Sequence, residues 1–344
     1  MPADITALQE ITKALVAPGK GILAADESLP TIEKRFKALG VESTEEERRA
    51  YRELLFTTPE IEKYISGIIM FDETLRLASL AQGKPAAKIL EERGIIPGIK
   101  VDMGKVDFPG FPNEEFTQGL DGLGKRLEEY VGLGAQFAKW RVVIAISESS
   151  PTRPVLEANM TGLAIYAGFC QQAGLVPIVE PEVLMDGNHD IAKCAGVTKQ
   201  MLEIMFKKFF EYKIVPEASL LKVNMILPGK DSAQKASPEE VAKQTLETLK
   251  SAVSVAIPGI VFLSGGQSPL EATANLDAIN KLASSVPWQL SFSYGRALQE
   301  PALVAWAGKV ENVAFAQKKF LKRAKMNSVA RDGKWEERME NERD

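Results

Sequence analysis

The feature that most constrains the fold is a series of short apolar runs separated by longer segments with helical patterns. Nearly all runs are continuous rather than alternating, which is typical of strands buried on both faces of a parallel sheet. The eight runs cover residues 21–27, 65–71, 98–102, 137–146, 175–182, 220–226, 259–265 and 290–295. Strands that alternate with helices indicate βα units. The pattern therefore predicts a single (β/α)8 TIM barrel in the α/β class, with a doubly wound open sheet as the alternative.

Helix start signals lie in the segments between the runs. Residues 43–46, 237–240 and 268–271 each have the spacing of a capping box, and Pro269 stands at the first helical position of the third. We find no internal repeat and no linker in the 344 residues, a length that one α/β barrel commonly reaches. The last residues, RDGKWEERMENERD, are charged and nearly free of aliphatic side chains. We therefore expect a barrel domain over residues 1–328 and a flexible tail over 329–344.

Composition narrows the class of function. The net charge of -4 gives no reason to expect nucleic-acid binding, which usually requires a basic face. The single histidine, His189, argues against a histidine-based metal site, so we expect no metal and no cofactor. Cys170 and Cys194 lack metal spacing and are expected to be reduced thiols. The N-terminus has no signal-peptide pattern and no run is long enough for a membrane helix, so we expect no membrane contact and a cytoplasmic location.

Ionisable residues occur within or directly after the predicted strands, where a barrel should be apolar. Burial of a charge costs several kcal/mol unless the charge is paired. Catalytic groups of barrel enzymes come from the carboxyl ends of the strands, where several of these residues fall together. The residues are Asp26, Lys100, Asp102, Lys139, Arg141, Glu180, Glu182, Lys222 and Asn224. Their spacing of two within several strands predicts that pairs of polar side chains point into one lumen.

Lys222 stands among Leu220, Leu221 and Val223 in an apolar run. A lysine amine is nucleophilic only when it is unprotonated, a form that burial and a neighbouring cation such as Lys139 favour. Glu180 is a candidate general acid and base with a pKa raised by burial. The structural alternative is a buried ion-pair network, and both interpretations are compatible in an active site.

Two glycine-containing segments predict phosphate binding. Ser264 and Gly265 follow the seventh run, and Gly295 and Arg296 follow the eighth. The loops after strands seven and eight are the recurrent phosphate site of such barrels, and arginine binds phosphate oxygens bidentately. The basic pair of Lys34 and Arg35 follows the first run. Two separate basic regions indicate a substrate with two anionic ends.

Seven motifs resemble those of class I fructose-bisphosphate aldolases, in the family's order and over nearly the whole chain. The motifs are GILAADES (21–28), GIKVD (98–102), FAKWR (137–141), GLVPIVEPE (174–182), LLKVNM (220–225), FLSGGQS (262–268) and FSYGRAL (292–298). The resemblance implies reversible cleavage of fructose 1,6-bisphosphate into dihydroxyacetone phosphate and glyceraldehyde 3-phosphate, as in glycolysis and gluconeogenesis. It also implies a metal-independent lyase that forms a homotetramer.

The resemblance implies a role for each matching residue. Lys222 would form the Schiff base, Glu180 would transfer protons, Lys139 would provide electrostatic support, and Asp26 would accept the hydroxyl proton. The implied substrate-binding residues are Arg35, Lys100, Arg141, Glu182, Ser264, Gly265, Gly295 and Arg296. Many members of the family end in a catalytic tyrosine, whereas the last tyrosine here is Tyr294.

Several alternatives stay open at this point. One is an aldolase that acts on sedoheptulose 1,7-bisphosphate or on a keto acid. Another is a barrel that serves as a non-catalytic scaffold, against which the intact set of catalytic residues argues. A third is a lyase that holds Mg²⁺ with Asp and Glu alone.

Overall fold

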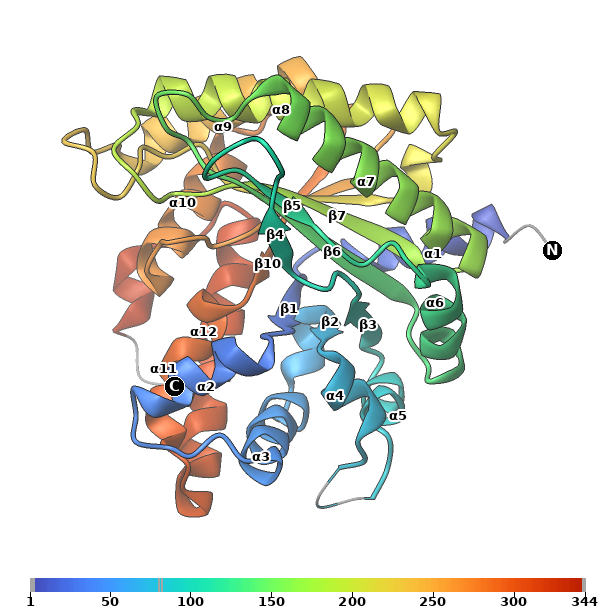
Figure 1. Cartoon of the computed structure of the whole chain (residues 1–344). Helices are drawn as coiled ribbons and strands as arrows, with labels where there is room; N and C mark the ends of the chain where they lie inside the picture. Colours follow the sequence, from blue (N-terminus) through green and yellow to red (C-terminus); the bar gives the residue numbers. More distant parts are fainter. Residues whose placement is uncertain (1–3, 80, 82, 342–344) are drawn as a thin grey trace.

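The computed structural model describes residues 4–79, 81 and 83–341, and in this part of the chain eight parallel strands close into a barrel (Figure 1). In chain order the barrel strands are β1 (Gly21–Ala25), β2 (Ile65–Met70), β3 (Ile96–Lys100), β6 (Phe137–Ile144), β7 (Val176–Val183), β8 (Leu220–Val223), β9 (Gly259–Phe262) and β10 (Gln289–Tyr294). Neighbours around the barrel follow the order β1-β10-β9-β8-β7-β6-β3-β2. Pairing of β1 with β10 closes the barrel, so the predicted fold is confirmed and the open-sheet alternative is wrong.

Helices surround the strands as expected for βα units (Figure 1). The α-helices are α1 (Ile5–Leu15), α2 (Leu29–Lys37), α3 (Glu45–Phe56), α4 (Asp72–Arg76), α5 (Ala86–Glu92), α6 (Leu123–Gly132), α7 (Arg153–Ala173), α8 (Ile191–Glu211), α9 (Pro238–Ala252), α10 (Pro269–Leu282), α11 (Arg296–Trp306) and α12 (Val313–Arg331). Short 3-10 helices are η1 (Ile61–Lys63), η2 (Pro216–Ala218), η3 (Val310–Asn312) and η4 (Glu337–Glu340).

The helix start signals agree with the structure in two of three places. Ser268 and Glu271 form a complete capping box before α10, and the Ser237 side chain accepts from the backbone N–H of Glu240 before α9. The expectation for residues 43–46 is wrong by one residue. Thr44 caps α3, because its hydroxyl accepts from the backbone N–H of Glu47 at 3.1 Å.

One pair of strands lies outside the barrel and was not predicted. β4 (Lys105–Asp107) and β5 (Glu115–Thr117) form an antiparallel hairpin between β3 and β6. Both strands are three residues long, and β4 is exposed throughout. Such strands bury too little apolar surface to leave a hydrophobic run in the sequence.

Two apolar layers form the core. The larger layer lies between the barrel strands and the surrounding helices. A smaller layer fills the barrel itself, where Leu8 and Leu15 of α1 pack with inward-facing residues such as Ile22 and Val261. Apolar packing therefore fills the end of the barrel that α1 covers.

The C-terminal region continues the packed structure beyond the expected boundary at residue 328. α12 extends to Arg331, whose guanidinium donates to the carbonyl oxygen of Val16 at 2.6 Å. Trp335 packs against the large core layer, and η4 follows it. The expected tail is thus anchored over its described part, and residues 342–344 lie outside the described residues.

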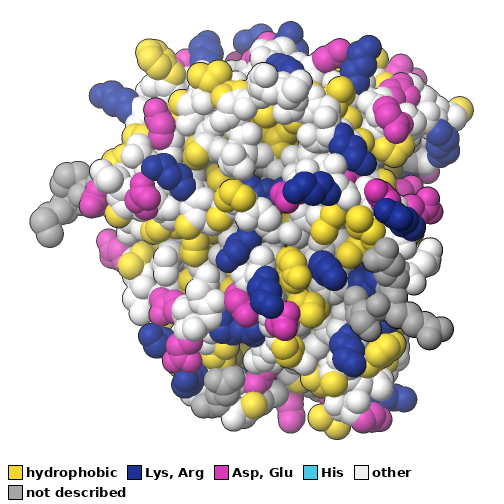
Figure 2. Space-filling model, turned by 180° about the vertical axis from the view of Figure 1, so that it is seen from behind, with side chains coloured by type: hydrophobic (Ala, Val, Ile, Leu, Met, Phe, Trp, Pro, Cys, Tyr) yellow, Lys and Arg dark blue, Asp and Glu magenta, His cyan; other side chains and the backbone are white. Residues whose placement is uncertain are grey.

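The face of the molecule that lies behind the view of Figure 1 carries charges of both signs. On the face shown in Figure 2, Lys and Arg side chains are interspersed with Asp, Glu and hydrophobic side chains. None of the helices in the described part of the chain combines the length and the hydropathy needed to span a membrane.

Candidate active site

Inward-facing side chains of the barrel strands change from apolar to charged toward the carboxyl ends. On β8, Leu220 belongs to the inner core and Lys222 follows on the same face, because side chains along a strand alternate with a period of two. On β7, Glu180 follows the inner Ile178 in the same way, and β6 contributes Lys139. The strand pattern therefore places two lysines and a glutamate next to the inner apolar layer, on its side toward the carboxyl ends of the strands.

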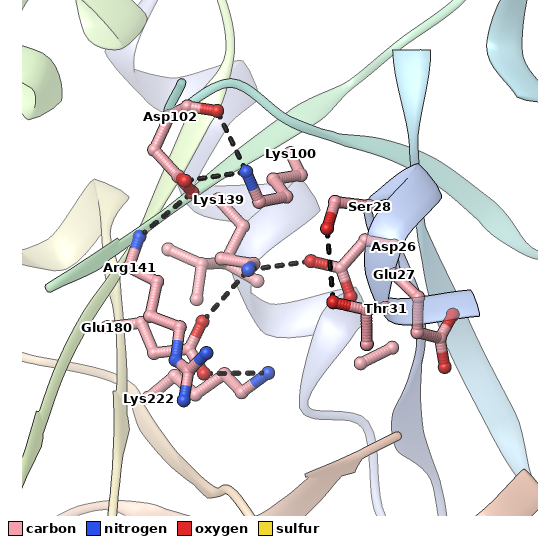
Figure 3. Close-up of polar contacts among 12 residues, drawn as sticks. Asp26, Glu27, Ser28, Thr31, Lys100, Asp102, Lys139, Arg141, Glu180 and Lys222 are labelled. Carbon is pink, nitrogen blue, oxygen red and sulfur yellow. Dashed lines mark hydrogen bonds and ion pairs between the residues drawn. The ribbon is translucent and has the colours of Figure 1, made fainter. Parts of the chain in front are cut away.

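Four of these charged groups form one connected network (Figure 3). The Nζ atom of Lys139 lies 2.6 Å from Asp26 Oδ2 and 3.1 Å from Glu180 Oε2. The Nζ atom of Lys222 lies 3.2 Å from Glu180 Oε1. The side chains of Lys139, Glu180 and Lys222 are each only 4% exposed. The ion-pair interpretation and the catalytic interpretation thus apply to the same residues.

The network fixes the protonation of its carboxyl groups. Burial acts to raise the pKa of Glu180, but the positive charges of Lys139 and Lys222 outweigh burial and hold it below its ordinary value. Burial also acts to raise the pKa of Asp26, but the charges of Lys139 and Lys222 outweigh it and hold this pKa well below its ordinary value. The prediction that burial raises the pKa of Glu180 is therefore wrong, because charges from neighbouring strands dominate. Glu180 is a carboxylate, and so a proton acceptor, at neutral pH.

Lys139 is held as a cation by the same contacts. Burial acts to lower its pKa, but Asp26 and Glu180 outweigh burial and raise it above the ordinary lysine value. A permanent positive charge therefore lies between the two carboxylates.

A second group of ion pairs lies at the carboxyl ends of the strands, and its Lys100–Asp102 pair is drawn in Figure 3. Lys100 Nζ lies 2.5 Å from Asp102 Oδ1, and Arg141 Nε lies 2.5 Å from Glu182 Oε2. Asp102 also accepts from the backbone N–H of Arg141 at 3.3 Å. The Arg141 side chain is 43% exposed, so its guanidinium faces solvent while Glu182 orients it.

Arg35 reaches the site from α2. Its Nη1 donates to Glu27 Oε1 at 2.5 Å, and Glu27 also pairs with Arg52 at 2.7 Å. Two arginines therefore share one carboxylate, which leaves an excess of positive charge beside the cavity. Lys34, the other half of the predicted basic pair, is exposed on α2.

The loops after β9 and β10 face each other. Arg296 donates through Nη2 to the carbonyl oxygens of Gly265 at 3.4 Å and Gln267 at 3.1 Å. Within the described residues no carboxylate pairs with Arg296, and its buried Nε has no hydrogen-bond partner. Gly265 has φ +54°, a conformation that favours glycine. The segments after β9 and β10 thus present to the cavity a cation without a carboxylate partner among the described residues and the backbone of a glycine.

One open cavity of about 520 Å³ joins these groups, and its lining includes all twelve residues to which the resemblance gives a catalytic or substrate-binding role. It is also lined by residues that the sequence reasoning did not assign. These are Glu27, Ser28, Thr31, Met185, Asp186 and Lys230, among others. The hydroxyls of Ser28 and Thr31 lie 3.1 Å apart at the start of α2, and their position after β1 is the signal that could have indicated them. Lys230 comes from a loop and carries no comparable signal.

Other polar residues do not face the cavity as expected. Asn224 follows the end of β8, and its Oδ1 accepts from the backbone N–H of Val183 at 2.9 Å while its Nδ2 donates to Thr198. The expectation that Asn224 points into the barrel lumen beside Lys222 is therefore wrong.

The histidine and the cysteines lie outside the cavity lining. His189 is 8% exposed in a loop, and Cys170 and Cys194 are free thiols. Among the described residues no group of three or more His, Cys, Asp or Glu side chains has an arrangement that could hold a metal ion.

A closed parallel barrel with buried lysines and carboxylates at the carboxyl ends of its strands is the architecture of a barrel enzyme. The sequence matches the family model described as fructose-bisphosphate aldolase class-I over residues 7–344. The chain belongs to the class I fructose-bisphosphate aldolases, and it is an aldolase, a carbon–carbon lyase.

Individual relatives support this assignment. A probable fructose-bisphosphate aldolase class 1 from Xanthomonas campestris pv. campestris is 53% identical over 96% of this chain and 99% of its own length. The cytosolic fructose-bisphosphate aldolase 4 from Arabidopsis thaliana is 55% identical over 91% of this chain and 79% of its own. The solved structure of a Plasmodium falciparum fructose-bisphosphate aldolase, in complex with TRAP and a small-molecule inhibitor, matches with a TM-score of 0.95 and 49% identity, covering 98% of this chain and 97% of that one.

Proposed function

We propose that this aldolase cleaves fructose 1,6-bisphosphate reversibly into dihydroxyacetone phosphate and glyceraldehyde 3-phosphate through a Schiff base on Lys222. The observation that carries the proposal is the contact of Lys222 Nζ with Glu180 Oε1 at 3.2 Å in the barrel mouth. A buried amine beside a proton acceptor is the arrangement that imine formation requires.

Glu180 transfers protons during imine formation. The Lys222 amine attacks the substrate ketone and passes a proton to the Glu180 carboxylate. Glu180 then returns this proton to the oxygen of the former ketone, which gives a neutral carbinolamine. A second proton, taken up from solvent through Glu180, lets the carbinolamine hydroxyl leave as water, and the nitrogen lone pair completes the protonated imine. The contact distance between the two groups permits direct transfer, and the lowered pKa of Glu180 supplies the acceptor form at the start.

Asp26 serves the cleavage step. Its carboxylate accepts the proton of the hydroxyl beside the breaking carbon–carbon bond, and the bonding electrons move into the protonated imine to give an enamine. Lys139, 2.6 Å from Asp26, keeps this carboxylate ionised before the reaction. Protonation of the enamine and hydrolysis of the imine then release the second product and regenerate Lys222.

Two basic regions bind the two phosphates. Ser264, Gly265, Gly295 and Arg296 take one phosphate, since Arg296 is not neutralised by a carboxylate in the described part of the chain. At the other end of the cavity, Arg35, Lys100 and Arg141 take the second phosphate, with Glu182 holding Arg141 in place.

Trapping with borohydride tests the mechanism. We expect incubation with dihydroxyacetone phosphate followed by borohydride to fix substrate mass on the peptide that carries Lys222, because borohydride reduces an imine to a stable secondary amine. EDTA should leave the yield unchanged. A folded protein without an adduct on Lys222 would disprove the mechanism.

A pair of variants controls this experiment. Lys222→Met should abolish both the adduct and the cleavage of fructose 1,6-bisphosphate. Lys105→Met removes an exposed lysine that pairs with Glu115, and it should leave both unchanged. Loss of the adduct in both variants would indicate a general loss of structure and would contradict a specific role for Lys222.

The proposal extends to the setting of the enzyme. A metal-independent homotetramer in the cytoplasm, working in glycolysis and gluconeogenesis, agrees with the class I family and with the cytosolic names of relatives from Arabidopsis thaliana.

A further inference from the structure

The C-terminal segment of residues 332–341 crosses α10 after the end of α12. The backbone N–H of Trp335 donates to Asp277 Oδ1 of α10 at 2.8 Å. The indole Nε1 of Trp335 donates to Glu340 Oε1 at 3.1 Å, and Lys322 Nζ donates to the Glu340 carbonyl oxygen at 2.8 Å. Both ends of the segment are therefore attached to the barrel helices, although the segment is rich in charge.

Glu340 reaches a buried arginine of α12. Arg323 is 6% exposed, and its Nη1 donates to both carboxylate oxygens of Glu340 at 2.6 Å. Its Nη2 donates to the carbonyl oxygen of Pro269 at 3.2 Å and to Thr273 Oγ1 at 2.5 Å. In the described part of the chain Glu340 is the one carboxylate that pairs with Arg323. The guanidinium thus connects the C-terminal segment to the first turn of α10.

The first turn of α10 continues directly into the phosphate loop, which we define as residues 264–267. Asn275 of α10 donates to Gln267 Oε1 at 2.7 Å, and Gln267 Nε2 donates to the carbonyl oxygen of Ser264 at 3.0 Å. Arg296 donates to the carbonyl oxygen of Gln267 at 3.1 Å. Displacement of the α10 N-terminus would therefore move both the loop and the cation that faces it.

We propose that Glu340 is a positioning residue for substrate binding, and that it fixes the phosphate loop through Arg323 and the first turn of α10. The proposal rests on the proposed role of residues 264, 265 and 296 in phosphate binding. Without Glu340 the buried guanidinium of Arg323 lacks its counter-charge, and an unpaired buried charge drives rearrangement toward solvent. That rearrangement loosens the hold on Pro269 and on the loop beyond it. The buried groups that perform the chemistry lie on other strands and keep their contacts.

The Glu340→Gln variant tests the proposal, since it removes the charge and keeps the shape of the side chain. We expect the KM for fructose 1,6-bisphosphate and the inhibition constant for inorganic phosphate to rise together by about tenfold, which corresponds to about 1.4 kcal/mol of binding free energy. The kcat should stay within about twofold of the parent. Trapping of dihydroxyacetone phosphate on Lys222 at saturation should remain complete.

The matched control is Glu336→Gln in the same segment. Glu336 is 53% exposed and pairs with Arg338, so its loss should change neither constant. The Trp335→Phe variant keeps the aromatic packing and removes one hydrogen bond to Glu340, so it should shift both constants in the same direction by a smaller factor.

Two outcomes would overturn the proposal. One is an unchanged KM and phosphate inhibition constant in the Glu340→Gln variant of an active parent, whatever the change in Tm. The other is an equal effect of Glu336→Gln. If the Glu340→Gln variant does not fold, the Trp335→Phe variant provides the test. An unchanged KM and an unchanged phosphate inhibition constant in that variant would overturn the proposal. An inactive parent would instead count against the proposed function itself.

Discussion

At the scale of single residues, Lys139 is the centre of the site. It contacts Asp26 and Glu180 at once, and its positive charge lowers the pKa of both carboxyl groups. One buried side chain therefore sets the charge state of the acceptor in the cleavage step and of the proton-transfer group.

Replacement of Lys139 by Met should cost about 3–5 kcal/mol of unfolding free energy, because it leaves buried carboxylates without their main counter-charge. Cleavage activity should fall by at least about a hundredfold, within the range that positioned proton transfer contributes. Urea unfolding and steady-state kinetics measure the two effects. Lys105→Met is the exposed control, and an equal stability loss there would contradict the assignment.

The lowered pKa values of Asp26 and Glu180 also predict how stability depends on pH. A carboxyl group whose folded pKa lies below its unfolded value stabilises the fold above the unfolded pKa, and this stabilisation disappears as the pH falls through the folded pKa. We expect the Tm to fall below about pH 4, the ordinary range of these groups. Lys139, with its raised pKa, stabilises below about pH 10 and loses this contribution only at higher pH.

In the Lys139→Met variant, burial of Glu180 is opposed by fewer cations, so its pKa rises. The acid decrease in Tm should therefore begin at a higher pH than in the parent. A scan of Tm against pH for both proteins checks this shift. If Tm began to fall at the same pH in both, Lys139 would not be what lowers the pKa of Glu180.

The ionisable residues of the site were predictable because a charge within an apolar run is visible in the sequence. Lys222 among leucines and Glu180 at the end of a hydrophobic run are such cases. The contact between Lys139 and Asp26 was not predictable, because 113 residues of chain separate position 26 from position 139. Ser28 and Lys230 also become neighbours of the site only when separate loops meet.

At the scale of elements, glycines in the strands make room for the inner core. An added Cβ on Gly98 of β3 would lie 2.2 Å from Phe137 Cζ of β6, within the small layer that fills the barrel. The two residues face each other in the paired strands. The glycine is therefore required by packing rather than by its backbone angles.

The Gly98→Ala variant should lose about 1–3 kcal/mol of unfolding free energy, the usual cost of an overpacked core. Gly196→Ala is the control, since Gly196 lies exposed within α8 with no atom within 4 Å of an added Cβ. That change should stabilise by about 0.5–1 kcal/mol through helix propensity. Chemical denaturation measures both, and a stable Gly98→Ala variant would show that Phe137 moves aside freely.

At the scale of the whole molecule, the two halves of the chain meet through β1 and β10 and through the packing of α12 on α3 (Figure 1). Closure brings Arg296, the first residue of α11 after β10, to the same cavity as Asp26 after β1. The site therefore depends on a closed barrel, and no single strand–helix unit could form it.

We expect the protein to assemble into a homotetramer in solution, with a molar mass about four times the 37.6 kDa of one chain. The expectation comes from its membership of the class I family. Light scattering coupled to size-exclusion chromatography measures the mass at several protein concentrations. A single-chain mass throughout would contradict it.

The sequence by itself determined the number and order of the barrel strands and the buried charges at their ends. Apolar runs, and ionisable residues within or directly after them, can be recognised from neighbouring residues in the chain. The β4–β5 hairpin left no such feature, since its strands bury little. Tertiary structure alone decided which charges pair, and hence that the pKa of Glu180 is lowered rather than raised. It also decided that Trp335 and Glu340 are anchored on α10 and α12. The physical reason is that Coulomb interaction depends on distance in space, and barrel closure sets those distances between residues far apart in the chain.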